Sequence, residues 1–108
     1  MKRKFLSNCL TDSMLSSLKD RGLVVPQSID MSEISKESDL YCSIKNKGLL
    51  GTLEKRYEIV PKENVGTILL EKGDTIYVVS PSESIFMYTD SDSLPEYITI
   101  NATKYEIE

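Results

Sequence analysis

The stretch Val65–Ser80 carries the strongest pattern of apolar positions in the chain. Two apolar runs, Thr67–Leu70 and Thr75–Val79, flank a polar turn that contains a Gly-Asp pair typical of hairpins. The second run is rich in β-branched and aromatic side chains, which favour strands. Neighbouring apolar residues within each run, in place of strict alternation, indicate strands covered on both faces. We therefore predict a central β-hairpin over about residues 67–79.

Shorter patterns on either side of the hairpin predict the remaining strands and helices. Pro26 cannot donate to a strand ladder, so the strand near it should lie at a sheet edge or break there. The predicted strands are Lys4–Ser7, Leu23–Val25 with a continuation at Ser28–Ile29, Leu40–Lys45 and Thr103–Ile107. The predicted helical segments are Met14–Asp20, a turn within Met31–Ser38, Lys47–Glu58, and a short helix from Ser93 through Ile98.

The predicted helix Lys47–Glu58 has a capping residue and an unusual pair of glycines. Asn46 is a favoured N-cap residue. Gly48 and Gly51 lie within the helix, where each costs about 1 kcal/mol relative to alanine. Such a pair indicates close approach by a backbone or by a ligand, and we favour backbone packing.

This order of elements predicts one α+β domain spanning residues 1–108. Its sheet should be mixed, with five or six strands around the central hairpin, and helices should cover it. A chain of 108 residues is long enough for a single modest core.

The net charge and the lack of long apolar stretches limit the classes of partner and the location that we expect. The formal net charge of −4 argues against binding of long nucleic acid by bulk electrostatics. Basic residues are concentrated at the start and in the middle of the sequence, so a compact anion could still find a local positive site. The alternative is an ordinary surface of mixed charge. No signal peptide or membrane-spanning stretch is evident, so we expect a cytoplasmic protein whose Cys9 and Cys42 are reduced thiols.

The sequence contains no histidine. It therefore lacks the side chain best suited to proton transfer near neutral pH, and the usual activating partner of a serine or cysteine nucleophile. It also lacks the commonest transition-metal ligand, and two separate cysteines do not make a zinc site. We expect neither a metal nor a cofactor.

Several motifs together resemble a known family. The opening KFLSNCLTDSML has the strand–Asn–turn–Met–Leu order of that family, and the spacing from the strand ending at Lys45 to the hairpin is similar. The hairpin turn Lys72-Gly73-Asp74 and the terminal strand Lys104–Ile107 also fit. The chain thus resembles the small viral ring-nuclease family of anti-CRISPR proteins, found in archaeal viruses, bacteriophages and mobile elements.

The resemblance implies a two-fold homodimer in the host cytoplasm with a cleft across its interface. In that family the cleft holds cyclic tetra-adenylate, the second messenger of type III CRISPR immunity. The ring is cut without a metal: a ribose 2′-hydroxyl attacks the adjacent phosphate, and a histidine protonates the leaving oxygen.

The chain departs from the family at the catalytic positions. The histidine position falls on Asn46, which cannot supply a proton at neutral pH. The arginine before the hairpin falls on Val65, and a glutamine and an arginine after it are replaced by Ser80 and Ser84. We therefore expect no catalytic residue of the family type.

The resemblance and the local basic residues together give a set of candidate ligand-binding residues. Their alternative roles are ordinary turn chemistry for the first three and a helix N-cap for Asn46. The candidates are Asn8, Thr11, Ser13, Asn46, Lys47 and Lys45.

Three functional hypotheses follow. The first is a homodimer that sequesters a cyclic oligonucleotide without fast cleavage. The second is a slow metal-independent ring nuclease that works by pre-organising the 2′-hydroxyl, with Lys47 assisting. The third is a protein-interaction module that inhibits a host factor through the acidic C-terminal third, where Tyr88, Tyr97 and Tyr105 lie.

Overall fold

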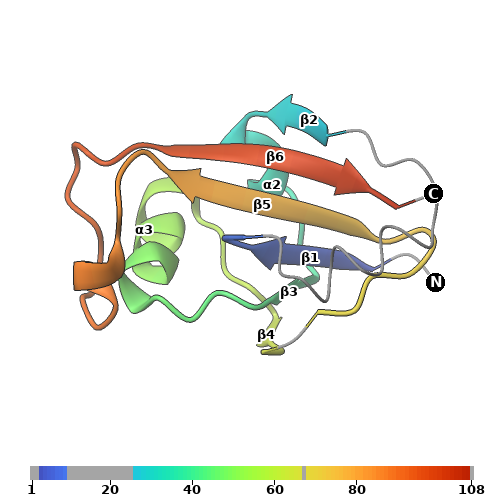
Figure 1. The fold of residues 1–108 in the computed structure, drawn as a ribbon, viewed down its shortest axis with the longest axis horizontal. Helices are drawn as coiled ribbons and strands as arrows, with labels where there is room; N and C mark the ends of the chain where they lie inside the picture. Colours follow the sequence, from blue (N-terminus) through green and yellow to red (C-terminus); the bar gives the residue numbers. More distant parts are fainter. Residues whose placement is uncertain (1–2, 10–25, 67, 108) are drawn as a thin grey trace.

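Strand β5 (Thr75–Pro81) lies in the middle of a six-stranded sheet, paired in parallel with β1 and antiparallel with β6 (Figure 1). The computed structural model describes residues 3–9, 26–66 and 68–107. The strand order is β2-β6-β5-β1-β3-β4. The other strands are β1 (Lys4–Ser7), β2 (Pro26–Ile29), β3 (Leu40–Cys42), β4 (Glu63–Asn64) and β6 (Ile100–Glu106). The mixed sheet and its covering helices confirm the predicted α+β class.

The sheet combines a parallel half with an antiparallel half. β1, β3, β4 and β5 run in parallel, while β6 runs opposite to β5 and β2 opposite to β6. Parallel neighbours need a crossover connection, and α3 (Lys47–Tyr57) supplies it between β3 and β4. β2 is an edge strand with Pro26 as its first residue, which confirms the expectation for this proline.

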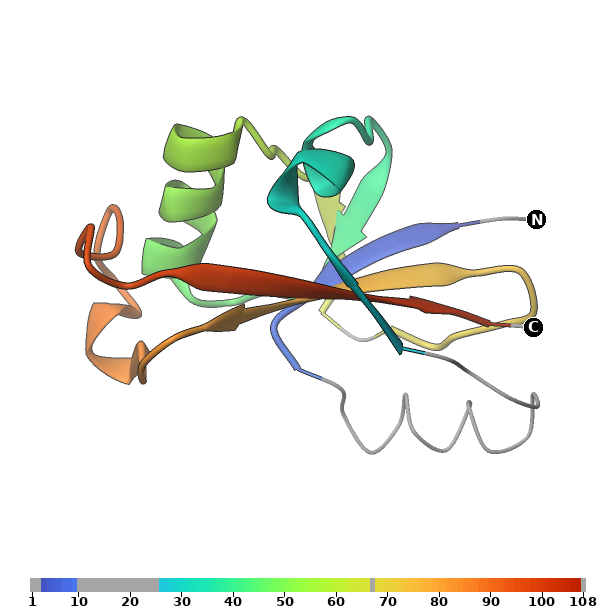
Figure 2. The same cartoon turned by 90° about the horizontal axis from the view of Figure 1, so that it is seen from above.

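β5 is buried on both faces, as the sequence predicts. Tyr77 and Val79 belong to a core cluster on one face, and Ile76 and Val78 belong to a second cluster on the other. On the first face, α2 (Met31–Ser35) and α3 cover the sheet (Figure 2). A strand with two covered faces has no polar side, which explains its continuous apolar run.

The predicted hairpin over residues 67–79 is wrong in its first half. Residues 68–70 form no strand, because β1 and β6 already occupy both edges of β5. Ile68 and Leu70 are instead buried in the second core cluster, while Leu69 is 62% exposed. The segment covers the second face of the sheet without joining its ladder (Figure 2). A paired strand and a buried covering segment both favour apolar residues. The sequence pattern alone therefore did not distinguish them.

Helix α3 begins at the predicted residue, Lys47, and ends at Tyr57, one residue before the predicted end. Asn46 caps it by accepting a hydrogen bond from the Leu49 N–H at 3.0 Å. A Cβ added to Gly48 would lie 2.5 Å from the Tyr88 carbonyl oxygen, and one added to Gly51 would lie 1.8 Å from that of Asp92. The glycine pair therefore admits a crossing backbone, which confirms the packing interpretation.

Glu58 ends α3 in a left-handed conformation with φ 57° and ψ 32°. Left-handed geometry costs an L-residue about 1–2 kcal/mol, and glycine avoids that cost. We expect Glu58→Gly to raise the free energy of unfolding by about 0.5–1 kcal/mol, the gain being reduced by glycine's larger unfolded-state entropy. Urea unfolding measures this difference, and Glu54→Gly, inside the same helix, should instead lower stability by about 1 kcal/mol.

The predicted helix from Ser93 through Ile98 is also wrong, because this segment forms a turn. The Leu94 N–H donates to Thr52 Oγ1 at 2.6 Å. The Arg56 guanidinium donates to the carbonyl oxygens of Pro95 and Ile98 at 2.7 and 2.6 Å. α3 thus satisfies backbone groups that a local helix would otherwise pair.

Other predicted elements fall inside and outside the described residues. The strand over residues 4–7 and the helical turn after Asp30 are confirmed. The helix predicted over residues 14–20 and the strand over 23–25 lie outside the described residues. None of the helices in the described part of the chain is long and apolar enough to cross a membrane.

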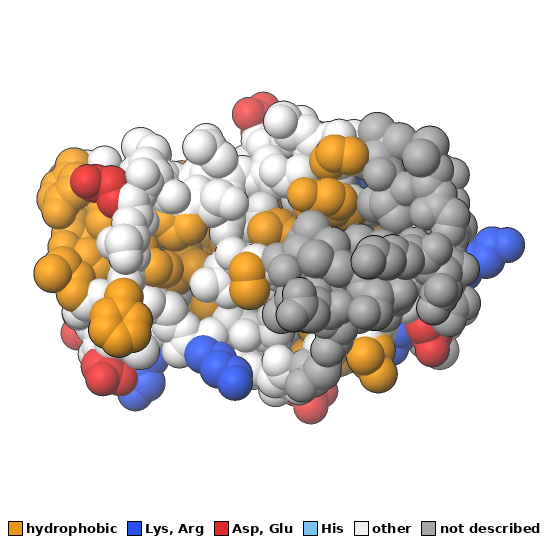
Figure 3. Space-filling model, in the orientation of Figure 1, with side chains coloured by type: hydrophobic (Ala, Val, Ile, Leu, Met, Phe, Trp, Pro, Cys, Tyr) orange, Lys and Arg blue, Asp and Glu red, His pale blue; other side chains and the backbone are white. Residues whose placement is uncertain are grey.

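The end of the molecule beyond α3 carries exposed apolar side chains (Figure 3). It is formed by the 3-10 helix η1 (Phe86–Tyr88) and the chain that leads from it toward β6. Phe86, Met87 and Tyr97 are all well exposed there.

Candidate functional site

The carboxyl ends of three neighbouring parallel strands meet at one edge of the sheet. β5, β1 and β3 all run toward the end of the molecule where α3 and η1 lie (Figure 1). In open sheets with parallel strands, ligands bind outside such carboxyl ends. Asn8 follows β1, and Lys45, Asn46 and Lys47 follow β3. We call this region, with these four residues, the carboxyl edge.

Two serines that were not among the sequence candidates join the strands at this edge. Ser7 is 1% exposed, and its hydroxyl donates to the Cys9 carbonyl oxygen at 2.9 Å. The Ser43 hydroxyl donates to Ser7 Oγ, also at 2.9 Å. The bonds hold the turn at Asn8 against the end of β3. Their only sequence signal is a polar residue at the end of each strand.

Asn46 has a structural role that uses both ends of its amide. Its oxygen caps α3, and its Nδ2 donates to the Ile85 carbonyl oxygen at 2.9 Å. The second bond links the start of α3 to the segment before η1. Asn46 therefore positions the loop between β3 and α3, and its amide oxygen and one amide hydrogen are engaged within the chain.

Lys45 and Lys47 are both exposed at the start of α3. The Lys47 N–H donates to the Thr89 carbonyl oxygen at 2.9 Å, which fixes its backbone. The first turn of α3 contains no acidic residue. A cation next to a helix N-terminus costs about 0.3–1 kcal/mol, because the helix dipole is positive there. Locally unfavourable residues of this kind are typical of functional positions.

Four of the six candidates follow the carboxyl ends of β1 or β3 in the chain. Asn8 is half-buried beside Ser7, and the other three follow β3. Thr11 and Ser13 lie outside the described residues.

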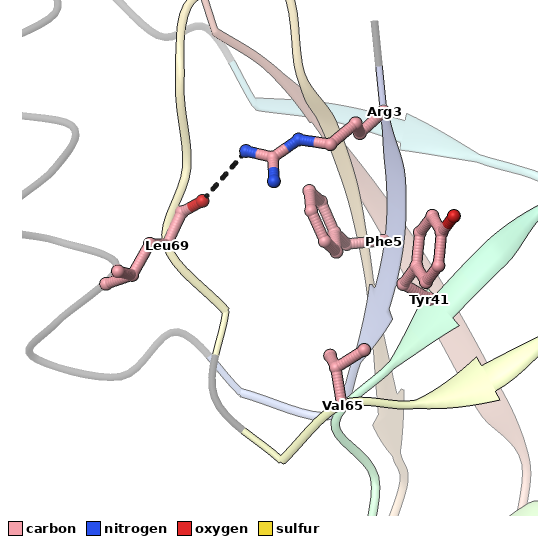
Figure 4. A pocket seen from close by; sticks show the side chains of 5 residues that line it. All are labelled: Arg3, Phe5, Tyr41, Val65 and Leu69. Atoms are coloured by element: carbon pink, nitrogen blue, oxygen red, sulfur yellow. Dashed lines mark hydrogen bonds between the residues drawn. The ribbon is translucent and has the colours of Figure 1, made fainter.

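A hollow of about 390 Å³ lies near the opposite, amino end of β1 and β3 (Figure 4). The Arg3 guanidinium lies on its rim, 5.1 Å from the centre of the Phe5 ring, and donates to the Leu69 carbonyl oxygen at 3.2 Å. Its Nη2 donates to Asp74 Oδ2 at 2.8 Å, and this interaction raises the pKa of Arg3. With its charge balanced by Asp74, Arg3 is a poor candidate for anion binding. The lining residues are Arg3, Phe5, Tyr41, Val65 and Leu69.

A neighbouring hollow of about 420 Å³ contains charges of both signs. Lys4 pairs with Glu37 at 2.6 Å, and Lys62 lies 3.8 Å from Asp39. Burial, with Glu37 adding to it, raises the pKa of the Tyr77 hydroxyl to about 12. Tyr77 therefore stays protonated at neutral pH, and the two ion pairs join β1 and the chain before β4 to the loop between α2 and β3.

The two cysteines are free thiols, as expected. Burial raises the pKa of Cys42, so this thiol is unsuited to act as a nucleophile. Among the described residues, no three His, Cys, Asp or Glu side chains are grouped closely enough to hold a metal ion.

Comparison with known proteins adds no family to this description. No family model matches the chain, and a search of curated proteins gives no match. Its function is therefore inferred from the geometry of the carboxyl edge and from the motifs of the sequence.

Proposed function

We propose that the protein binds a cyclic oligonucleotide, of the cyclic tetra-adenylate type, at the carboxyl edge. The observation that supports this proposal is that Asn8 follows β1 while Lys45 and Lys47 follow β3, the adjacent parallel strand. These residues come from separate parts of the sequence and include two exposed cations. In a host cell, such binding would withdraw the ring from the immune signalling that depends on it.

Each group at the edge has a distinct role in this proposal. The ammonium groups of Lys45 and Lys47 bind phosphate oxygens, and the Asn8 amide donates to the phosphate or a base edge. Asn46 positions the loop through its bonds to Leu49 and Ile85. Ser7 and Ser43 hold the two turns at a fixed separation.

A second copy of the chain completes the site. A cyclic tetranucleotide carries four phosphates, whereas one carboxyl edge offers two lysines. A two-fold homodimer that places two such edges around one ring would supply four cations to four phosphates, in matching symmetry. The proposed ligand therefore requires a homodimer, and the dimer is part of the proposal.

The proposed action is sequestration. Fast cleavage of the ring by its own 2′-hydroxyl requires a proton donor for the leaving oxygen, and lysine ammonium groups are weak acids at neutral pH. The Asn46 amide does not give up a proton, and its N–H already donates to Ile85. Binding groups alone therefore hold the ring in an intact form.

Calorimetric titration with cyclic tetra-adenylate, followed by chromatography of the recovered ligand, tests this function. We expect saturable binding at one ring per two chains and recovery of intact ring. Recovery of linear products would show that the protein cleaves the ring slowly and does not only sequester it. If the titration gives no heat and the ligand does not change the melting temperature of the protein, this ligand is rejected.

A further inference from the structure

Three large apolar side chains are exposed together at the end of the molecule that carries η1. Phe86 is 86% exposed, Met87 76% and Tyr97 68%. Phe86 and Met87 belong to η1, and the hydroxyls of Tyr88 and Tyr97 lie 3.5 Å apart. Hydrophobic side chains gather at this end in the space-filling view (Figure 3). We call Phe86, Met87 and Tyr97 the aromatic patch.

The backbone beneath the aromatic patch is held by the rest of the fold. Asn46 donates to the Ile85 carbonyl oxygen just before η1, and Arg56 donates to those of Pro95 and Ile98 on either side of Tyr97. The Tyr88 backbone packs against Gly48 of α3. A fixed backbone presents apolar side chains at low entropic cost to a partner.

The segment that carries the aromatic patch is acidic. The sequence from residue 73 through 103 contains no lysine or arginine. The hydrogen bond with Tyr88 is the main cause that raises the pKa of Tyr97, and the nearby negative charge of Glu83 adds to it. Figure 3 shows acidic side chains at the margin of this end, with basic side chains beside them at its lower side. The exposed carboxylates of this segment are Glu83, Asp90, Asp92 and Glu96.

We infer that the aromatic patch docks a basic segment of another protein, one that combines lysine or arginine side chains with an apolar anchor. The anchor packs on Phe86 and Met87, and the cations pair with the carboxylates of this segment or stack on Tyr97. A second copy of this chain is disfavoured at the aromatic patch, because a two-fold contact there would bring the carboxylates together. Nucleic acid and anionic lipid are disfavoured at the positions of these carboxylates.

Fluorescence anisotropy with a defined peptide tests this inference. The probe is a labelled amphipathic peptide with leucine and tryptophan on one face and lysine on the other. A matched peptide carries glutamate in place of lysine. We expect the basic peptide to bind, and Phe86→Ser with Met87→Ser to weaken that binding about tenfold or more. Leu69→Ser, which removes an exposed leucine elsewhere, should leave it within about twofold.

Four outcomes would overturn the inference. These are failure of the basic peptide to bind, equal binding of the acidic peptide, equal weakening by Leu69→Ser, and a homodimer that dissociates in Phe86→Ser. The inference is independent of the proposed nucleotide site, so Phe86→Ser should leave titration with cyclic tetra-adenylate unchanged. Loss of ring binding in that variant would assign the patch to the nucleotide site, which lies close by through the bond between Lys47 and Thr89.

Discussion

Replacing Asp74 with alanine is expected to lower the free energy of unfolding by about 3 kcal/mol. The Asp74 side chain is fully buried, and its carboxylate accepts hydrogen bonds from the Arg3 side chain at 2.8 Å and 3.3 Å and from the Glu71 N–H at 2.8 Å. Loss of one partner from a buried pair costs about 3–5 kcal/mol. We expect the lower end of this range, because the Arg3 side chain is 33% exposed and can turn toward water.

Urea unfolding of Asp74→Ala measures this loss, and Glu71→Ala is the matched control. Glu71 also lies near Arg3, at 3.5 Å, but its side chain is 67% exposed. An exposed ion pair contributes about 0–1 kcal/mol, so the control should change little. Similar losses in the two variants would contradict the buried pair as the source of the stability.

Gly51→Ala is expected to cost about 2 kcal/mol or more, although alanine is the better helix former. The added Cβ would lie 1.8 Å from the Asp92 carbonyl oxygen and 2.9 Å from its carbonyl carbon. Both atoms belong to a backbone, so neither can rotate away. Overpacking costs about 1–3 kcal/mol and sometimes more, against about 1 kcal/mol gained in helix propensity.

The loss in Gly51→Ala is measured by the shift of its urea midpoint. Lys55→Ala places the same side chain at an exposed position one turn later in α3 and should stay within about 0.5 kcal/mol of the parent chain. A neutral or stabilising Gly51→Ala would show that the backbone near Asp92 does not cross α3 as described.

Local patterns predicted the elements whose determinants are close in sequence. α3 has its cap, its apolar face and its glycine pair within twelve residues, and the structure reproduces it. The alternation of β3 and the edge position of β2 also follow from single side chains.

The errors arose where distant residues compete for the same groups. Ile68 and Leu70 have strand-like burial, but β1 and β6 occupy the edges of β5, and this cannot be read from residues 65–80. The segment ending at Ile98 is held as a turn by Arg56, which lies 42 positions away. Such contacts depend on the topology of the whole sheet, which local propensity does not predict.

The candidate site was predictable to a similar extent. The sequence indicated the turn at Asn8 and the residues around Asn46, and parallel pairing of β1 with β3 brings their carboxyl ends together. It did not reveal that the Asn46 amide also bonds to Ile85, 39 residues away. This contact gives a candidate ligand-binding group a structural role as well.

The measurement that tests the proposed binding edge most directly is titration of Lys47→Glu and Lys55→Glu with cyclic tetra-adenylate. Both variants change the net charge equally, at opposite ends of α3. Lys47→Glu places an acid in the first turn and should stabilise the fold by about 0.5–1 kcal/mol, so weaker binding would not reflect unfolding. We predict that Lys47→Glu weakens binding about tenfold or more, while Lys55→Glu leaves it within about twofold. Equal affinities for the two variants would contradict a binding site at the carboxyl edge.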